Sequence, residues 1–145
     1  MKKFFAIIAT TLLVASVYAF DPNVSEKVLK SFNETFSSAQ DIKWEKYESY
    51  YTVSFNQAGI QSKVNYDHNG TMLSSLRYYE PKFLPLNIYN RIKKNYSKKE
   101  MFGVTEVTFN NDVVYYVKLQ DDKSWITVKI DGVGNSEVVE KYKKA

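Results

Sequence analysis

Residues Trp44 to Gly70 read WEKYESYYTVSFNQAGIQSKVNYDHNG, and a similar pattern stands 64 positions later in Val114 to Gly134, VYYVKLQDDKSWITVKIDGVG. With this single offset and no gap, apolar positions align with apolar positions at a period of two, and turn residues align with turn residues. The aligned pairs include Tyr51 with Tyr115, Val53 with Val117, Val64 with Val128, Asp67 with Asp131 and Gly70 with Gly134. Each stretch therefore predicts a strand, a short loop, a second strand and a turn.

A helix is predicted before each hairpin. Asn23 followed by Glu26 has the spacing of a capping box, and apolar residues then recur from Val24 to Phe36 every four positions. Pro85 opens a second helix whose apolar stripe includes Ile88 and Ile92. The remaining pattern predicts strands at 42–47, 50–55, 60–66 and 72–79 in the first half, and at 104–109, 114–119, 124–130 and 137–142 in the second.

The order of these elements predicts an α+β fold built from two tandem helix-plus-four-strand repeats, at about 21–80 and 84–145. A repeat of some sixty residues buries a sheet face poorly by itself, so the two repeats are expected to share one core in a single domain, residues 20–145. Hairpin-linked strands are antiparallel. We therefore expect one curved antiparallel sheet with both helices on one face and the other face open to solvent.

The first 19 residues have the pattern of a signal peptide. Lys2 and Lys3 precede an apolar run of 11 residues, and Val17-Tyr18-Ala19 is a small-x-small cleavage signal. A membrane anchor is the alternative, but a spanning helix needs about twenty apolar residues. The expected mature chain begins at Phe20, has no membrane span, and is periplasmic or secreted from a bacterium. The sequence has no cysteine, which excludes disulfides, thiolate chemistry and a cysteine-linked lipid anchor.

The charge balance gives no reason to expect a nucleic-acid partner. The formal charge is +4, and loss of two lysines with the signal peptide leaves +2. A local basic cluster does occur around the second helix, but its members fall away from the apolar stripe and indicate a solvated helix face. The cluster consists of Arg91, Lys93, Lys94, Lys98 and Lys99.

The order of apolar and turn positions resembles the beta-lactamase-inhibitor-like, PepSY-like family of exported bacterial proteins. The resemblance rests on Trp44, Tyr51-x-Val53-x-Phe55, Val64-x-Tyr66-Asp67-x-x-Gly70, Leu84-Pro85, Tyr115-Tyr116-Val117-x-Leu119 and Val128-x-Ile130-Asp131-Gly132. It covers almost the whole mature chain. The resemblance implies a periplasmic or secreted protein of a kind common in Bacteroidetes, with no established catalytic residues. It also implies the doubled helix-plus-sheet layout of a protein that inhibits beta-lactamase, although inhibition by this chain is not implied.

The residues needed for catalysis or metal binding are nearly absent. The single histidine, His68, lies in the turn Asp67–Gly70, where a solvated turn residue is expected rather than a general base. Asp121 and Asp122 have the chemistry of a hairpin loop and lack the later bidentate acid of a calcium loop. We therefore predict a non-enzyme with no catalytic residues, no cofactor and no metal.

The open sheet face is the predicted binding surface. If Val117 and Val128 point towards the helices, their neighbours along each strand must point away. Large aromatic and lysine side chains on such a face are typical of protein interfaces, and the predicted site residues are Tyr50, Lys63, Tyr116, Lys118, Trp125 and Lys129. Cross-strand aromatic packing on a solvated sheet is the equally weighted alternative.

Two functions remain open from the sequence. The first is a non-catalytic module that binds or inhibits another exported protein through this face. The second is a binder of a small molecule or envelope component, or an undetected enzyme, that uses a cleft between the two repeats. The sequence does not identify the partner, the ligand, the oligomeric state or the biological role.

Overall fold

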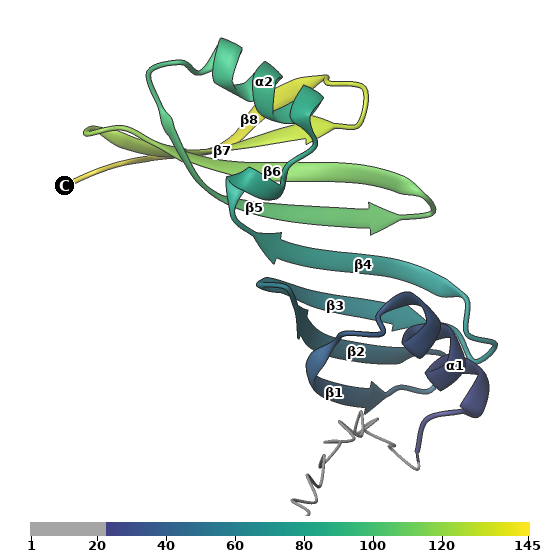
Figure 1. The fold of residues 1–145 in the computed structure, drawn as a ribbon. Helices are drawn as coiled ribbons and strands as arrows, with labels where there is room; N and C mark the ends of the chain where they lie inside the picture. The colour runs from purple at the N-terminus through teal and green to yellow at the C-terminus, as the bar shows by residue number, and fades with distance from the viewer. Residues whose placement is uncertain (1–22) are drawn as a thin grey trace, which may run out of the picture.

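The computed structural model describes residues 23–145 as one antiparallel sheet of eight strands with two α-helices and a short 3-10 helix. Strands that are consecutive in sequence are neighbours in the sheet, from β1 to β8 (Figure 1). The elements in chain order are α1 (Glu26–Thr35), β1 (Gln40–Lys46), β2 (Tyr51–Gln57), β3 (Ile60–Tyr66), β4 (Met72–Tyr79), η1 (Pro81–Phe83), α2 (Leu86–Asn95), β5 (Glu100–Phe109), β6 (Asp112–Gln120), β7 (Ser124–Asp131) and β8 (Ser136–Lys143). The expected α+β class and antiparallel open sheet are confirmed, while the predicted signal peptide lies outside the described residues.

Helix α1 begins two residues later than the capping box predicted. Its N-cap is Ser25, whose hydroxyl accepts a hydrogen bond from the backbone N–H of Val28 at 3.4 Å, and not Asn23. Serine is as good an N-cap as asparagine, so the sequence alone did not distinguish the two starts. The predicted apolar stripe does face the sheet, where Val28 and Phe32 are fully buried.

Helix α2 follows the sequence pattern closely. Pro85 is its N-cap and Ile88 and Ile92 are buried. Arg91, Lys93, Lys94 and Lys98 of the predicted basic cluster are exposed, as expected for a solvated face. Lys99 differs, because it lies beyond the end of α2 and its largely buried side chain pairs with Asp121.

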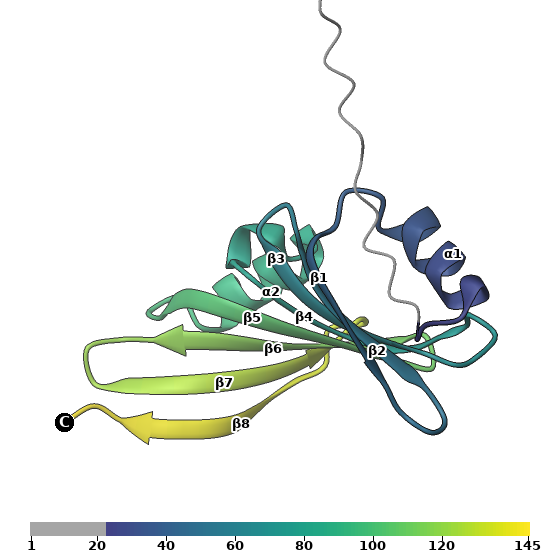
Figure 2. The same cartoon turned by 90° about the horizontal axis from the view of Figure 1, so that it is seen from below.

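The strand register places both helices on the same face of the sheet. Residues paired directly across antiparallel strands point to the same side, and one continuous row of pairs runs from β2 to β6: Val53, Val64, Ser75, Thr108 and Val113. Val53 packs in the cluster under α1, and Val113 packs against the cluster under α2. The expected placement of the helices is therefore confirmed, and both are seen on one side of a strongly twisted sheet in Figure 2.

The buried apolar side chains form two clusters, so the prediction of one shared core is wrong. The first cluster joins α1 to β2 and β3, and the second joins α2 to β4–β7. Between them, β4 and β5 place polar side chains on the helix face, and these interrupt the apolar surface. The interrupting residues are Ser75, Arg77, Glu106 and Thr108.

A partly buried ion pair, in which the Glu106 carboxylate is the more buried partner, occupies the boundary between the clusters. The Glu106 carboxylate accepts hydrogen bonds from Arg77 Nη1 at 3.0 Å and from the Tyr79 hydroxyl at 2.6 Å. Burial, together with the hydrogen bond to Glu106, raises the pKa of Tyr79. Both carboxylate oxygens thus have partners, as a buried charge requires.

Each helix is also contacted by a turn of the sheet. Asp67 Oδ1 accepts the N–H groups of Asn69 and Thr71, which shapes a turn ending at Gly70 with φ +86°. The Ser31 hydroxyl of α1 donates to the Gly70 carbonyl at 2.7 Å. A Cβ at position 70 would lie 2.8 Å from the Lys27 carbonyl oxygen, so only glycine permits this approach.

The corresponding turn in the second half lies beside α2. Asp131 Oδ1 accepts the N–H groups of Val133, Gly134 and Asn135, and Gly134 has φ +97°. Here the Cβ of a larger residue would meet the Arg91 side chain at 2.5 Å. Both turns therefore bring a positive-φ glycine close to a helix.

Candidate functional site

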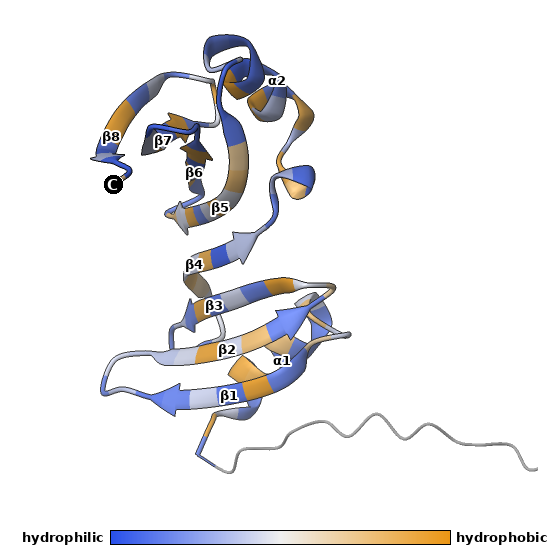
Figure 3. Ribbon diagram, turned by 90° about the vertical axis from the view of Figure 1, so that its left-hand side faces the viewer, coloured by the Kyte–Doolittle hydropathy of each residue, from blue (hydrophilic) through white to orange (hydrophobic). Residues whose placement is uncertain are grey.

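The face opposite the helices carries a patch of apolar and aromatic side chains on β4, β5 and β6. We call it the central patch; it consists of Leu76, Tyr78, Val107, Phe109, Val114 and Tyr116. Tyr78 is 45% exposed and Phe109 is 60% exposed, while the other four are half-buried. Hydrophobic and hydrophilic residues alternate along the strands, as the hydropathy colours of Figure 3 show.

The strand register brings these residues together. Leu76, Val107 and Val114 are opposite one another on three neighbouring strands, and so are Tyr78, Thr105 and Tyr116. Neighbouring strands lie about 4.8 Å apart, so Tyr78 and Tyr116 are separated by roughly 10 Å with Thr105 between them. Two aromatic rings thus flank one short side chain in the middle of the face.

Three predicted site residues border this patch. Lys63 lies opposite Leu76, and Lys129 lies opposite Tyr116. Lys118 follows on β6 and is exposed. Lys129 contacts Glu137 at 3.4 Å and Lys63 contacts Glu45 at 3.8 Å, both between partly exposed side chains. Such surface pairs hold the lysines weakly, so both ammonium groups remain accessible to a partner.

Tyr116 is less exposed than expected. The prediction placed a large exposed ring here, whereas the structure shows a half-buried one. The reason is that the period-two pattern gives the direction of a side chain but not the size of its neighbours. A ring that is packed on its flanks loses less conformational freedom on binding than a free one.

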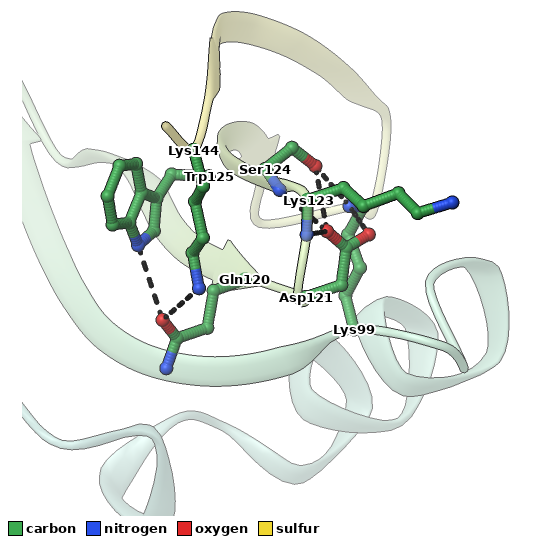
Figure 4. Close-up of polar contacts among 7 residues, drawn as sticks. All are labelled: Lys99, Gln120, Asp121, Lys123, Ser124, Trp125 and Lys144. Atoms are coloured by element: carbon green, nitrogen blue, oxygen red, sulfur yellow. Dashed lines mark hydrogen bonds and ion pairs between the residues drawn. The ribbon is translucent and has the colours of Figure 1, made fainter.

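Trp125 is 42% exposed, but its polar groups are engaged within the chain (Figure 4). Its indole N–H donates to Gln120 Oε1 at 3.2 Å, and the Lys144 ammonium lies 5.0 Å from the ring centroid. In the register, Trp125 lies opposite Gln120, four residues along β6 from Tyr116. That is roughly 13 Å at the usual rise per residue. These contacts favour the packing alternative for Trp125, at the margin of the face.

Tyr50 lies at the other end of the sheet, outside β2. Its ring stacks on Tyr47 with centroids 4.6 Å apart, in the loop between β1 and β2. The structure therefore brings Tyr116, Lys118 and Lys129 together, places Lys63 next to the central patch, and leaves Tyr50 and Trp125 at opposite margins.

The loop between β6 and β7 has a structural role. Asp121 accepts hydrogen bonds from the Lys99 ammonium and from the backbone N–H groups of Lys123 and Ser124 (Figure 4). The Lys99 ammonium, more than the other donors, holds the pKa of Asp121 well below its usual value. This is the hairpin chemistry that the sequence predicted.

His68 is a turn residue, as predicted. It is exposed, its Nε2 lies 3.0 Å from the Glu48 carbonyl oxygen, and its ring meets Tyr51 edge-on at 5.1 Å. Across residues 23–145, no three His, Cys, Asp or Glu side chains are grouped so as to hold a metal ion.

Of the six members of the central patch, only Tyr116 was among the predicted site residues. A signal was present, because Leu76 and Tyr78 alternate with Arg77 and Tyr79. The segment 72–79 nevertheless has large side chains at both odd and even positions, so its phase was undetermined. Only the pairing of Val64 with Ser75 shows which residues of β4 face the helices.

The fold is that of a group of solved Bacteroides proteins. A BLIP-like protein from Bacteroides fragilis matches with a TM-score of 0.58 and 17% identity, over 83% of this chain and 86% of that one. A DUF2874 family protein from Bacteroides uniformis matches with a TM-score of 0.55 and 20% identity, over 83% and 89% of the two chains. The resemblance to beta-lactamase-inhibitor-like proteins is thus confirmed for the fold.

A protein from Bacteroides eggerthii described as periplasmic has the same fold, with a TM-score of 0.56, 16% identity, and coverage of 83% of this chain and 88% of that one. No protein-family model matches the sequence, and no curated protein does. Among residues 23–145, no helix is both long and apolar enough to cross a membrane.

Proposed function

We propose that this chain is an exported, non-catalytic binding module that holds another envelope or secreted protein on its open sheet face. The observation that carries the proposal is the central patch, where six apolar or aromatic side chains share a face that neither helix covers. Export is supported by the signal-peptide pattern and by the periplasmic description of one structural neighbour. Among residues 23–145, no group of side chains described above supports a catalytic alternative.

The chemistry of the face suits a protein partner. Tyr78 and Tyr116 offer wide, rigid contact surfaces that lose little entropy on binding, and Phe109 adds an exposed ring at the end of β5. Lys63, Lys118 and Lys129 place positive charge around the patch, which favours a partner with acidic residues at its rim. Of the six predicted site residues, Tyr116, Lys63, Lys118 and Lys129 remain part of the proposed surface, while Tyr50 and Trp125 lie at its margins. The centre of the surface is thus moved towards β4 and β5.

We also propose that the fold arose by internal duplication of a helix-plus-four-strand unit. The alignment of Asp67 and Gly70 with Asp131 and Gly134 supports this, because both pairs build a turn with a positive-φ glycine against the preceding helix. In this view the pairing of β4 with β5 joined the two units, so that their open faces are continuous.

Capture from an envelope extract tests the proposed surface. The wild-type protein should retain a partner, and the double variant Tyr78→Ala/Tyr116→Ala should lose it, at about 2 kcal/mol or more for each hot-spot residue. Leu86→Ala is the matched control, because Leu86 is 73% exposed but lies on α2. The double variant Tyr116→Ala/Trp125→Ala should also weaken capture, because it removes Tyr116 from the central patch. Retention of every partner by both folded double variants would reject the open face as the binding surface.

A small-molecule site remains the second candidate. One observation favours it: a hollow of about 220 Å³ beside Arg77, on the helix face. Its lining residues all belong to the first half of the chain, close to the β4–β5 boundary with the second half. The hollow therefore differs from the predicted cleft, which was expected between the two repeats.

A further inference from the structure

The hollow beside Arg77 differs chemically from the open face on the other side of the sheet. It lies between the C-terminal end of α1, the β2–β3 hairpin and β4, with a volume of about 220 Å³. The residues that matter for its chemistry are Phe36, Phe55, Gln57, Ile60, Ser62 and Arg77. Drug-sized ligands occupy larger pockets, of about 300–1,000 Å³, so an occupant of this hollow must be a small metabolite.

Gln57 and Ser62 contribute polar side chains to the lining of the hollow. The Gln57 side-chain oxygen is buried and unpartnered. Ser62 is 7% exposed, and its side chain also lines the hollow. Buried polar groups in folded proteins are almost always hydrogen-bonded, so the unpartnered Gln57 oxygen, beside the Ser62 hydroxyl in one hollow, indicates a missing polar occupant.

Arg77 supplies a fixed cationic group at the same place. Its Nη1 donates to Glu106 at 3.0 Å, and its guanidinium carbon lies 5.6 Å from the Tyr79 ring centroid. One donor of the five on a guanidinium is used in this bond, which leaves others for a ligand carboxylate. Because Glu106 holds it, Arg77 is oriented before any ligand arrives.

Apart from Thr35, the rest of the hollow is apolar. Phe36 and Phe55 contact each other with ring centroids 4.7 Å apart, and Ile60 packs at the edge of the second cluster. A ligand therefore needs an acidic group for Arg77, a hydrogen-bond donor for Gln57 and an apolar body for these three side chains.

We propose that this hollow binds a free apolar α-amino acid of about the size of leucine. Its carboxylate accepts hydrogen bonds from Arg77 and the Ser62 hydroxyl, its ammonium donates to Gln57 Oε1, and its side chain packs on Phe36, Phe55 and Ile60. The zwitterion matches the charge of the site, because Glu106 already balances Arg77 and a ligand of zero net charge leaves that balance intact. The inference does not depend on the open face, which lies on the opposite side of the sheet.

Titration of the ¹⁵N-labelled protein with leucine, followed by amide NMR, tests the proposal. We expect saturable shifts with one dissociation constant at Gln57, Ser62 and Arg77, and none at Tyr116. Leucinamide lacks the carboxylate and N-acetyl-leucine lacks the ammonium, so each should bind at least tenfold more weakly than leucine. Equal binding of either analogue, non-saturating shifts, or shifts confined to other residues would overturn the proposal.

Variants provide an independent check. Ser62→Ala and Gln57→Leu should each weaken leucine binding about tenfold, because each removes a hydrogen bond to a charged ligand group. Gln61→Ala is the matched control, since Gln61 lies on the same strand but points to the open face. Unchanged affinity in both folded site variants would mean that leucine binds outside the hollow, and would overturn the proposal. Should a variant fail to fold, the comparison of leucine with its two analogues on the wild-type protein still decides the matter.

Discussion

Truncation of Phe32 tests how the two apolar clusters are coupled. Phe32 is 1% exposed, and its ring contacts those of Phe36, Trp44 and Phe55 at centroid distances of 5.6, 5.3 and 5.2 Å. Removing such a ring typically costs about 3–5 kcal/mol of unfolding free energy. With a urea m-value of about 1–3 kcal/mol per molar, Phe32→Ala should lower the urea midpoint by about 2 M.

The chain's two tryptophans allow each half to be followed separately. Trp44 packs in the first cluster and Trp125 lies on β7, so Trp125→Phe and Trp44→Phe variants leave one fluorescent reporter per half. We expect Phe32→Ala to shift both reporters by the same amount, because β4 and β5 pair over six positions and the Arg77–Glu106 ion pair joins them. Ile92 lies in the second cluster, and Ile92→Ala should lower the unfolding free energy by about 2–5 kcal/mol. It should also shift both reporters equally. A shift seen by one reporter alone would mean that the halves unfold independently, and the single-domain prediction would then be rejected.

Further predictions concern the two glycine turns, the stability of the protein at low pH, and export. Gly70→Ala should cost about 1–3 kcal/mol, and more than Gly134→Ala, because the new Cβ meets the Lys27 backbone in the first case and the flexible Arg91 side chain in the second; equal losses in thermal unfolding would contradict this. Lys99 and backbone donors lower the pKa of Asp121 in the folded state, so its stabilising effect is complete above the unfolded pKa of about 4 and is lost as pH falls through the folded pKa. The melting temperature of Asp121→Asn should therefore lie below that of the wild type at pH 6 and converge with it in strong acid, whereas a constant gap would argue against the linkage. Intact-mass measurement of protein from the host envelope should give a chain beginning at Phe20, and a retained Met1 would contradict cleavage.

The element order could be predicted from the sequence because hairpin signals in this chain are strong. Gly59 and the Asp67–Gly70 turn mark where strands end, and the expected strand 72–79 coincides with β4. The start of α1 was placed wrongly because Asn23 and Ser25 are both good caps, and local sequence does not decide between them.

The separation of the core into two clusters depends on contacts between strands that are distant in sequence. Arg77 and Glu106 are 29 residues apart, and neither is distinctive alone. Only when β4 pairs with β5 do they meet on the helix face and divide the apolar surface. The same pairing turns Tyr78 and Phe109 towards the open face, which explains why the candidate site was centred too far towards β7.

Site-specific photo-crosslinking tests the central claim most directly. A photoreactive phenylalanine analogue at position 109 would probe the central patch, and the same analogue at position 86 would probe the helix face, since both native side chains are exposed. Irradiation in envelope extract should join a partner protein to the chain through position 109 and not through position 86. Crosslinks through position 86 alone, or none at position 109 while the protein still captures its partner, would contradict binding through the open sheet face.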